Sequence, residues 1–137
     1  MKKVGVWLDK KVAYIFFEND RGTEEMRTVF SKTEEREEIS KVYRDKVKQG
    51  ATEKLSDKKL LEHEKHDLNL YFTEIANHFL DADEIVLFGP SLTAERLYKR
   101  LEVQNPQLKA KVKDVIKADS MTKNQTKALI KNYYRNQ

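Results

Sequence analysis

Two short apolar runs decide the fold of this 137-residue chain: VGVWL at residues 4–8 and VAYIFF at residues 12–17. Both runs are rich in β-branched and aromatic residues and lack polar alternation, which is typical of strands covered on both faces. Only Asp9-Lys10-Lys11 separates them, and this break is short enough for a hairpin. The runs therefore predict two neighbouring antiparallel strands in the middle of a sheet.

The chain continues with a third strand and then changes character. A turn signal at residues 19–22 precedes a segment in which Met26, Thr28 and Phe30 alternate with more polar positions, which predicts a half-exposed strand. Residues 32–59 crowd acidic and basic side chains together with few apolar ones, so they cannot form core. Their pattern leaves two alternatives open, a weakly amphipathic helix or a mobile excursion.

The second half of the chain alternates helices and strands. An apolar stripe at helical spacing predicts a long helix after Ser56-Asp57, and its members are Leu60, Leu61, Leu68, Tyr71, Phe72, Ile75, Phe79 and Leu80. The run at 85–88 predicts a buried parallel strand, which a second helix with Leu92, Leu97, Tyr98 and Leu101 follows up to Asn105-Pro106. A last strand is expected at 112–118, and a capping box at 122–125 opens the final helix.

This order predicts an α/β fold with a mixed five-stranded sheet, βββαβαβα, and helices on both faces. Each parallel return needs a right-handed helical crossover, which distributes the helices over the sheet. A chain of 137 residues has the usual length of one domain. We therefore expect a single domain over 1–137, with a charged insertion at about 32–59 after the third strand.

Composition narrows the class of protein. The chain has no Cys, which excludes disulfides and thiolate chemistry and points to a reducing compartment, by default the cytoplasm. No run reaches the roughly 20 apolar residues of a membrane span, and the first apolar run is too short for a signal peptide. We therefore expect a cytoplasmic protein without a membrane partner. The net charge of +4 permits a polyanionic partner, depending on where the charge lies.

Catalytic and metal-binding constellations are not evident. Asp9 is the single acid near the end of the first strand, and the fourth strand ends without one, so carboxylates do not converge as a two-metal nuclease requires. His63 and His66 lie one helical turn apart, but His78 is too distant to complete a metal site with them. We expect no catalytic residues, no metal and no cofactor, and binding rather than catalysis.

The loop Gly89-Pro90-Ser91 precedes a predicted helix. The exposed amides of a helix N-terminus carry partial positive charge and could bind an anion there. The simpler interpretation is structural, with Ser91 or Thr93 as the N-cap and Pro90 fixing the loop.

The C-terminal segment concentrates the positive charge. Lys123, Lys127, Lys131 and Arg135 recur every four residues, and no acid lies between residues 122 and 137. Like charges at this spacing weaken a helix slightly, so a purely structural helix would be expected to interleave acids. Phosphate binding gains from such a stripe through counterion release, although a merely solvated basic face is the alternative. The predicted RNA-binding residues are Lys109, Lys111, Lys113, Lys117, Lys123, Lys127, Lys131 and Arg135.

Three segments carry a resemblance to a known family: VWLDKKVAYIFF at 6–17, ADEIVLFGP at 82–90 and ADSMTKNQTKALIKNYY at 118–134. With the element order, they resemble the central domain of archaeal and eukaryotic peptide-chain release factors and Pelota. They are most similar to the bacterial single-domain relatives known as translational-machinery proteins. The resemblance covers nearly the whole chain outside 32–59. It implies a ribonuclease-H-like sheet and a ribosome, rRNA or tRNA as partner.

The resemblance also suggests where an active tip would lie. Release factors carry a Gly-Gly-Gln tip after the third strand, which helps to place the water that hydrolyses peptidyl-tRNA. The corresponding loop tip here is Lys48, Gln49 and Gly50, without a Gly-Gly pair. We therefore expect a ribosome- or RNA-associated binding module related to translation termination or ribosome rescue, without hydrolysis of peptidyl-tRNA. The alternatives are a peptidyl-tRNA hydrolase acting through the 32–59 loop, or a protein-interaction domain that uses exposed tyrosines.

Overall fold

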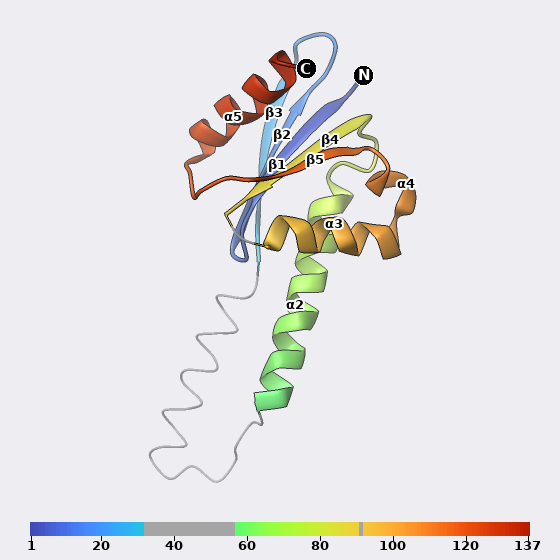
Figure 1. Ribbon diagram of the computed structural model, residues 1–137, viewed down its shortest axis with the longest axis vertical. Coiled ribbons are helices and arrows are strands. Elements are labelled where there is room, and N and C mark those ends of the chain that lie inside the picture. The colour runs from blue at the N-terminus through green and yellow to red at the C-terminus, as the bar shows by residue number, and fades with distance from the viewer. Residues whose placement is uncertain (32–56, 91) are drawn as a thin grey trace.

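A computed structural model describes residues 1–31, 57–90 and 92–137 of the chain (Figure 1). In the order of the chain, the elements are β1 (Lys3–Leu8), β2 (Val12–Glu18), β3 (Glu24–Phe30), α2 (Asp57–Asn77), β4 (Glu84–Gly89), α3 (Thr93–Gln104), α4 (Pro106–Lys109), β5 (Val112–Lys117) and α5 (Lys123–Arg135). The strands form one five-stranded sheet in the order β3-β2-β1-β4-β5.

The sheet is mixed, as the sequence predicts. β1 pairs antiparallel with β2 and parallel with β4, β2 pairs antiparallel with β3, and β4 pairs parallel with β5. The central hairpin is closed by Asp9, whose Oδ1 accepts hydrogen bonds from the backbone N–H groups of Lys11 and Val12, both at 2.8 Å. The acid near the end of β1 therefore has a structural role. Gly22 has a φ of 75° in the β2–β3 turn, a left-handed conformation that favours glycine.

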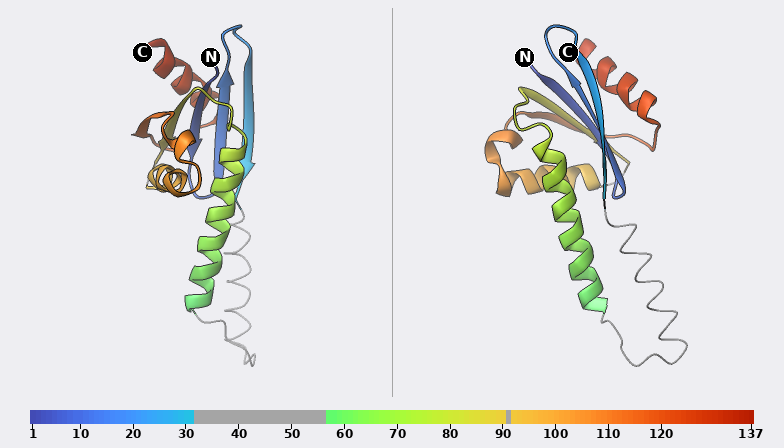
Figure 2. Two further views of the ribbon diagram at one scale, coloured as in Figure 1. Left: turned by 90° about the vertical axis from the view of Figure 1, so that its right-hand side faces the viewer. Right: turned by 180° about the vertical axis from the view of Figure 1, so that it is seen from behind.

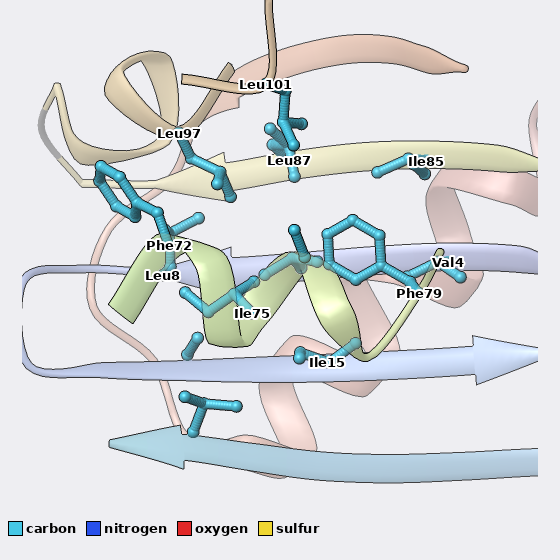
Figure 3. Packing of buried hydrophobic residues seen from close by; sticks show 14 of the residues in the cluster. Val4, Leu8, Ile15, Phe72, Ile75, Phe79, Ile85, Leu87, Leu97 and Leu101 are labelled. Atoms are coloured by element: carbon cyan, nitrogen blue, oxygen red, sulfur yellow. The ribbon is translucent and has the colours of Figure 1, made fainter. Parts of the chain in front are cut away.

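One face of the sheet packs against α2 and α3. Alternate residues of the central strands point to this side, where side chains such as Val4, Ile15 and Ile85 meet Ile75 and Phe79 of the α2 region (Figure 3). Leu97 and Leu101 of α3 complete this larger core over β4, and all of these side chains are at most 1% exposed. Continuous apolar runs in β1 and β4 are explained by this layer and by the second one on the opposite face.

The other face of the sheet packs against α5 (Figure 2, right). Trp7 and Phe88 lie in this second core with Ile130 of α5. The helix comes close because Gly5 has no side chain: a Cβ added there would lie 2.3 Å from Cγ2 of Ile130. Helices therefore cover both faces, as predicted.

Helix α2 is long and extends beyond the edge of the sheet (Figure 1). This explains why Leu61, which the apolar stripe places in the core, is 64% exposed. Leu80 lies past the end of the helix and is 52% exposed, so its assignment to the stripe is also wrong. Leu60 lies outside the described side chains. The other members of the stripe that the structure describes contact the core.

Two further apolar residues are more exposed than their patterns predict. Phe30 ends the edge strand β3 and is 72% exposed, because α5 packs over β1 and β2 instead. Leu92 is 59% exposed and occupies the N-cap of α3 without a side-chain hydrogen bond, so Thr93 is not the N-cap, and Ser91 lies outside the described residues. An apolar residue in a strand or helix pattern is thus exposed where no neighbouring element lies opposite it.

The predicted helix boundaries in the C-terminal part of the chain agree better with the structure. The capping box of α5 is confirmed: Thr122 Oγ1 accepts from the Gln125 N–H, and Gln125 Oε1 accepts from the Thr122 N–H. Asn105-Pro106 ends α3, as expected, but also begins the short helix α4, which the sequence analysis did not predict. There Asn105 Oδ1 accepts a hydrogen bond from the Leu108 N–H, with Pro106 at the first helical position.

Candidate nucleic-acid interface

Helix α5 is fixed on the sheet by its buried face. Ile130 is fully buried and Tyr134 is 7% exposed. The Tyr134 hydroxyl donates a 2.6 Å hydrogen bond to the Val4 carbonyl, and burial raises the pKa of this phenol. The neighbouring Tyr133 hydroxyl donates to Asp114 Oδ2 of β5, and burial followed by this hydrogen bond raises the pKa of Tyr133 to about 12. Both phenols stay protonated at neutral pH and serve to position the helix.

Two lysines of α5 reach across to the edge strand β3. Lys127 Nζ lies 3.0 Å from Glu24 Oε2, and Lys131 Nζ lies 2.6 Å from Glu24 Oε1. Hydrogen bonds from Lys131 and Lys127 hold the pKa of Glu24 below its usual value. The two lysines thus share one ionised carboxylate, so one positive charge of the three groups remains unbalanced.

The remaining basic residues of α5 extend this pattern. Lys123 at the start of the helix and Arg135 at its end are both exposed, and neither forms an ion pair within the described part of the chain. We name Lys123, Lys127, Lys131 and Arg135 the α5 stripe. It presents four cations against the single carboxylate of Glu24 over about 18 Å of helix.

The other predicted RNA-binding lysines do not join this surface. Lys109 Nζ lies 3.2 Å from Glu102 Oε1 and 5.1 Å from the centre of the Tyr98 ring, and Lys113 Nζ lies 2.9 Å from Glu84 Oε1. Lys111 precedes β5 and Lys117 ends it, about 20 Å apart along the strand. Of the eight predicted residues, the structure gathers four into the α5 stripe and disperses the other four around β5.

The other features considered in the sequence are the loop tip, the histidines as metal ligands and a membrane span. The loop tip Lys48, Gln49 and Gly50 lies outside the described residues. Among residues 1–31, 57–90 and 92–137, no group of three or more His, Asp or Glu side chains could hold a metal ion. His63 and His66 are exposed on α2, and His78 Nδ1 lies 3.2 Å from Nη1 of Arg27. No helix in the described part of the chain is long and apolar enough to cross a membrane.

A second cationic surface was missed by the sequence analysis. A cavity of about 700 Å³ opens between α2 and α3, and its cations come from α3, from α2 and from the β1–β2 turn. The available signal was the spacing of Arg96, Lys99, Arg100 and Val103, which places all four on one face of α3. This pattern was overlooked because the prediction of this helix rested on its apolar residues alone.

No protein-family model matches the sequence, and a search of curated proteins finds no relative. Solved structures do match. Pelota of Archaeoglobus fulgidus aligns over 96% of this chain and 31% of its own length, with a TM-score of 0.57 and 13% identity. Pelota of Thermoplasma acidophilum aligns over 96% and 32%, with a TM-score of 0.54 and 16% identity.

The archaeal translation termination factor aRF1 matches in the same way. It aligns over 98% of this chain and 39% of its own length, with a TM-score of 0.55 and 9% identity. This chain therefore spans about one third of the length of these proteins. At such identities the likeness is one of fold, and it confirms the resemblance that the three sequence segments indicate: the chain has the fold of one part of Pelota and of the archaeal release factor.

Proposed function

We propose that this protein is a ribosome- or RNA-associated binding module related to translation termination or ribosome rescue, and that it does not hydrolyse peptidyl-tRNA. The likeness in fold to a translation termination factor supports the process. The α5 stripe supports the mode of binding and is the observation that carries the proposal. Of its four cations, Lys127 and Lys131 share the carboxylate of Glu24, so the helix presents net positive charge on a surface that Tyr134 anchors to the sheet.

The chemistry of the stripe suits a phosphate backbone. Lys127 and Lys131 remain 42% and 34% exposed in their side chains while they contact Glu24. Exposed ion pairs contribute little and exchange readily, so a phosphate can replace or join the carboxylate. Each neutralised phosphate releases condensed counterions, which makes such binding steeply dependent on salt. The expected partner is therefore ribosomal RNA or tRNA, contacted through phosphates.

Co-sedimentation with ribosomes at increasing salt tests the proposal. We expect association at low salt that weakens steeply as salt rises. Replacing both Lys127 and Lys131 with Gln removes two phosphate contacts, so the slope of log affinity against log salt should flatten by roughly 1.5–2. Gln has nearly the helix propensity of Lys, so the fold should persist, which thermal melting checks.

A matched control removes two cations from the opposite face of the sheet. Arg96→Gln with Lys99→Gln changes the net charge equally but lies on α3, so the slope should stay as in the unaltered protein. Recovery of the protein wholly in the ribosome-free fraction at low salt would refute the proposal. Equal slopes for all three proteins would mean that the α5 stripe only solvates its helix.

The hydrolytic alternative has its own assay. Purified protein should release no peptide from peptidyl-tRNA, with or without ribosomes, because residues 48–50 lack the Gly-Gly-Gln pattern. Release that Gln49→Ala abolishes would instead establish a hydrolase acting through this loop.

A further inference from the structure

The groove lies where α3 crosses α2, and each helix contributes one stripe of residues to its lining (Figure 1). On α2, the lining residues recur at helical spacing from Leu61 to Phe72, and on α3 from Arg96 to Val103. The α2 stripe is continuous with the residues that pack on the sheet, but α2 extends beyond the sheet there, so its apolar positions continue without a strand opposite them (Figure 1). The stripe spans about 16 Å, or three turns of a helix.

Apolar side chains line the floor and rim of this groove. Phe72 lies at the floor and is 3% exposed, and Leu68 is partly buried against the core. At the rim, Leu61 is 64% exposed on α2 and Val103 is 77% exposed on α3. Two large aliphatic side chains on opposite walls of one cavity are suited to cover an apolar stripe on a ligand.

The charge of the groove is strongly one-sided. Its lining includes one carboxylate, Glu64, and five cations: Lys10, Lys65, Arg96, Lys99 and Arg100. In the described parts of the chain, none of these five cations forms an ion pair. The contrast with α5 is direct, because there the central lysines share a carboxylate of the same chain. Among the described residues, no carboxylate plays this part for the cations of the groove.

We propose that this groove binds an acidic, amphipathic helical segment of a partner protein. Its apolar side chains would lie between Leu61 and Val103, and its carboxylates would contact Arg96, Lys99 and Lys65 at the rim. The three-turn stripe of α2 and the combination of aliphatic side chains with positive charge select this ligand. The proposal concerns a surface other than the α5 stripe and is independent of RNA binding there.

The lining disfavours nucleic acid as the occupant. Single strands bind through exposed aromatic rings on which bases stack, and the one aromatic residue of the groove, Phe72, is buried. A phosphate backbone would neutralise the cations but would leave Leu61 and Val103 in water. An acidic amphipathic helix satisfies both sets of side chains.

A designed peptide of about 18 residues tests the proposal, since shorter helices are marginal in water. It carries Leu and Phe along one face and Glu elsewhere, and its binding to the full chain is followed by fluorescence anisotropy. Two further probes are the same peptide with Lys in place of Glu and a single-stranded RNA oligonucleotide. We expect binding of the acidic peptide, no binding of the basic one, and no displacement of the acidic peptide by RNA.

Variants of the groove have matched controls within the same molecule. Leu61→Gln should weaken binding of the acidic peptide about tenfold, because it removes an apolar wall. Leu70→Gln alters an exposed leucine of the same helix outside the groove and should leave the affinity unchanged. Arg96→Gln with Lys99→Gln should weaken binding about fivefold, whereas Lys127→Gln with Lys131→Gln should not change it.

All of these positions are at least one-third exposed, and melting curves identify any variant that fails to fold. Absence of binding up to about 1 mM protein would overturn the proposal. Equal effects of Leu61→Gln and Leu70→Gln would also overturn it. Displacement of the peptide by RNA would assign the groove to nucleic acid instead. A dimer in sedimentation analysis that Leu61→Gln dissociates would assign it to a second copy of this chain.

Discussion

The two faces of the sheet use their polar groups in different ways. On the α5 face, polar groups fix the helix: Tyr134 donates to the Val4 carbonyl, Trp7 Nε1 donates to the Asp119 carbonyl at 3.1 Å, and Glu24 receives two lysines. On the α2 and α3 face, the helices are held mainly by apolar packing around the core, with a 3.1 Å hydrogen bond from the Tyr71 hydroxyl to the Asp9 carbonyl, and the cations collect in a groove beside it.

The difference shows which charges serve the fold and which are left for partners. A helix that crosses a sheet over a glycine of β1 buries little apolar area along its sides. Its position is therefore set by specific polar contacts. Helix α2 extends beyond the sheet with its first turns, so the apolar residue Leu61 and the neighbouring cations stay exposed there. Binding of a partner should therefore be strongest at cations that are not paired with carboxylates of the same chain. Each of the following substitutions tests one face of the sheet.

The largest effect is expected in the core under α2. Phe79 is fully buried, and Phe79→Ala should lower the free energy of unfolding by about 3–5 kcal/mol, through lost burial and the cavity left behind. The adjacent Leu80 is 52% exposed, so Leu80→Ala should cost less than about 1 kcal/mol. Chemical denaturation measures both changes. Similar losses for the two variants would contradict the packing of this face.

The next effect concerns the close approach of α5 to β1. Gly5→Ala places a Cβ against Ile130, and overpacking of this kind costs about 1–3 kcal/mol. Ile130→Ala alone should cost about 2–5 kcal/mol, but it removes the three side-chain atoms that the new Cβ would meet. The double variant should therefore lose less free energy of unfolding than the two single variants lose together, by at least about 1 kcal/mol. Strict additivity in denaturation experiments would mean that α5 does not lie where Gly5 and Ile130 meet.

The sequence predicted what depends on local pattern and on burial along single elements. The strands buried on both faces at 4–8, 12–17 and 85–88, the half-exposed third strand and the capping box at Thr122 were all predicted from residues within a few positions of one another. These signals suffice for the element order and for a mixed sheet. No such signal exists for α4, because a single helical turn capped by Asn105 is too short to show a periodicity, and this helix was missed.

The parts that could not be predicted depend on contacts between distant residues. Glu24 and Lys131 are far apart in sequence, so the periodic stripe gave no sign that a strand would neutralise part of it. Leu61 has the spacing of a core residue, and only the position of α2 relative to the sheet shows that it is exposed. The groove exists because α2 and α3 meet, which neither helical pattern contains by itself.

A smaller effect separates the two tyrosines of α5. Tyr134→Phe removes the buried hydrogen bond to the Val4 carbonyl and should cost about 0.5–1.5 kcal/mol. Tyr133→Phe removes a hydrogen bond to the exposed carboxylate of Asp114, which water can replace, so its cost should be smaller. Thermal unfolding of the two variants in parallel measures the difference. A larger loss for Tyr133→Phe would place the anchoring contact on the β5 side of the helix.

The smallest effect on stability is expected for Glu24→Gln, which tests whether the α5 stripe is held for the fold or available to a ligand. The side chains of Glu24 and both lysines are partly exposed, so the Tm should change by less than about 3 °C. The pKa of Glu24 is lowered in the folded state, so its contribution is present above its ordinary value of 4.5 and is lost as pH falls through the folded pKa. The Tm difference from the unaltered protein should therefore disappear in acid.

Binding should respond in the opposite direction. Without the carboxylate, Lys127 and Lys131 are both free to contact phosphates, so affinity for RNA or ribosomes should rise by a few fold, most visibly at low salt. Glu102→Gln is the control, because it releases Lys109, which lies outside the stripe. If Glu24→Gln lowered the Tm strongly and left RNA affinity unchanged, the two lysines would serve the fold alone, and the contrast between the faces would then rest on the groove.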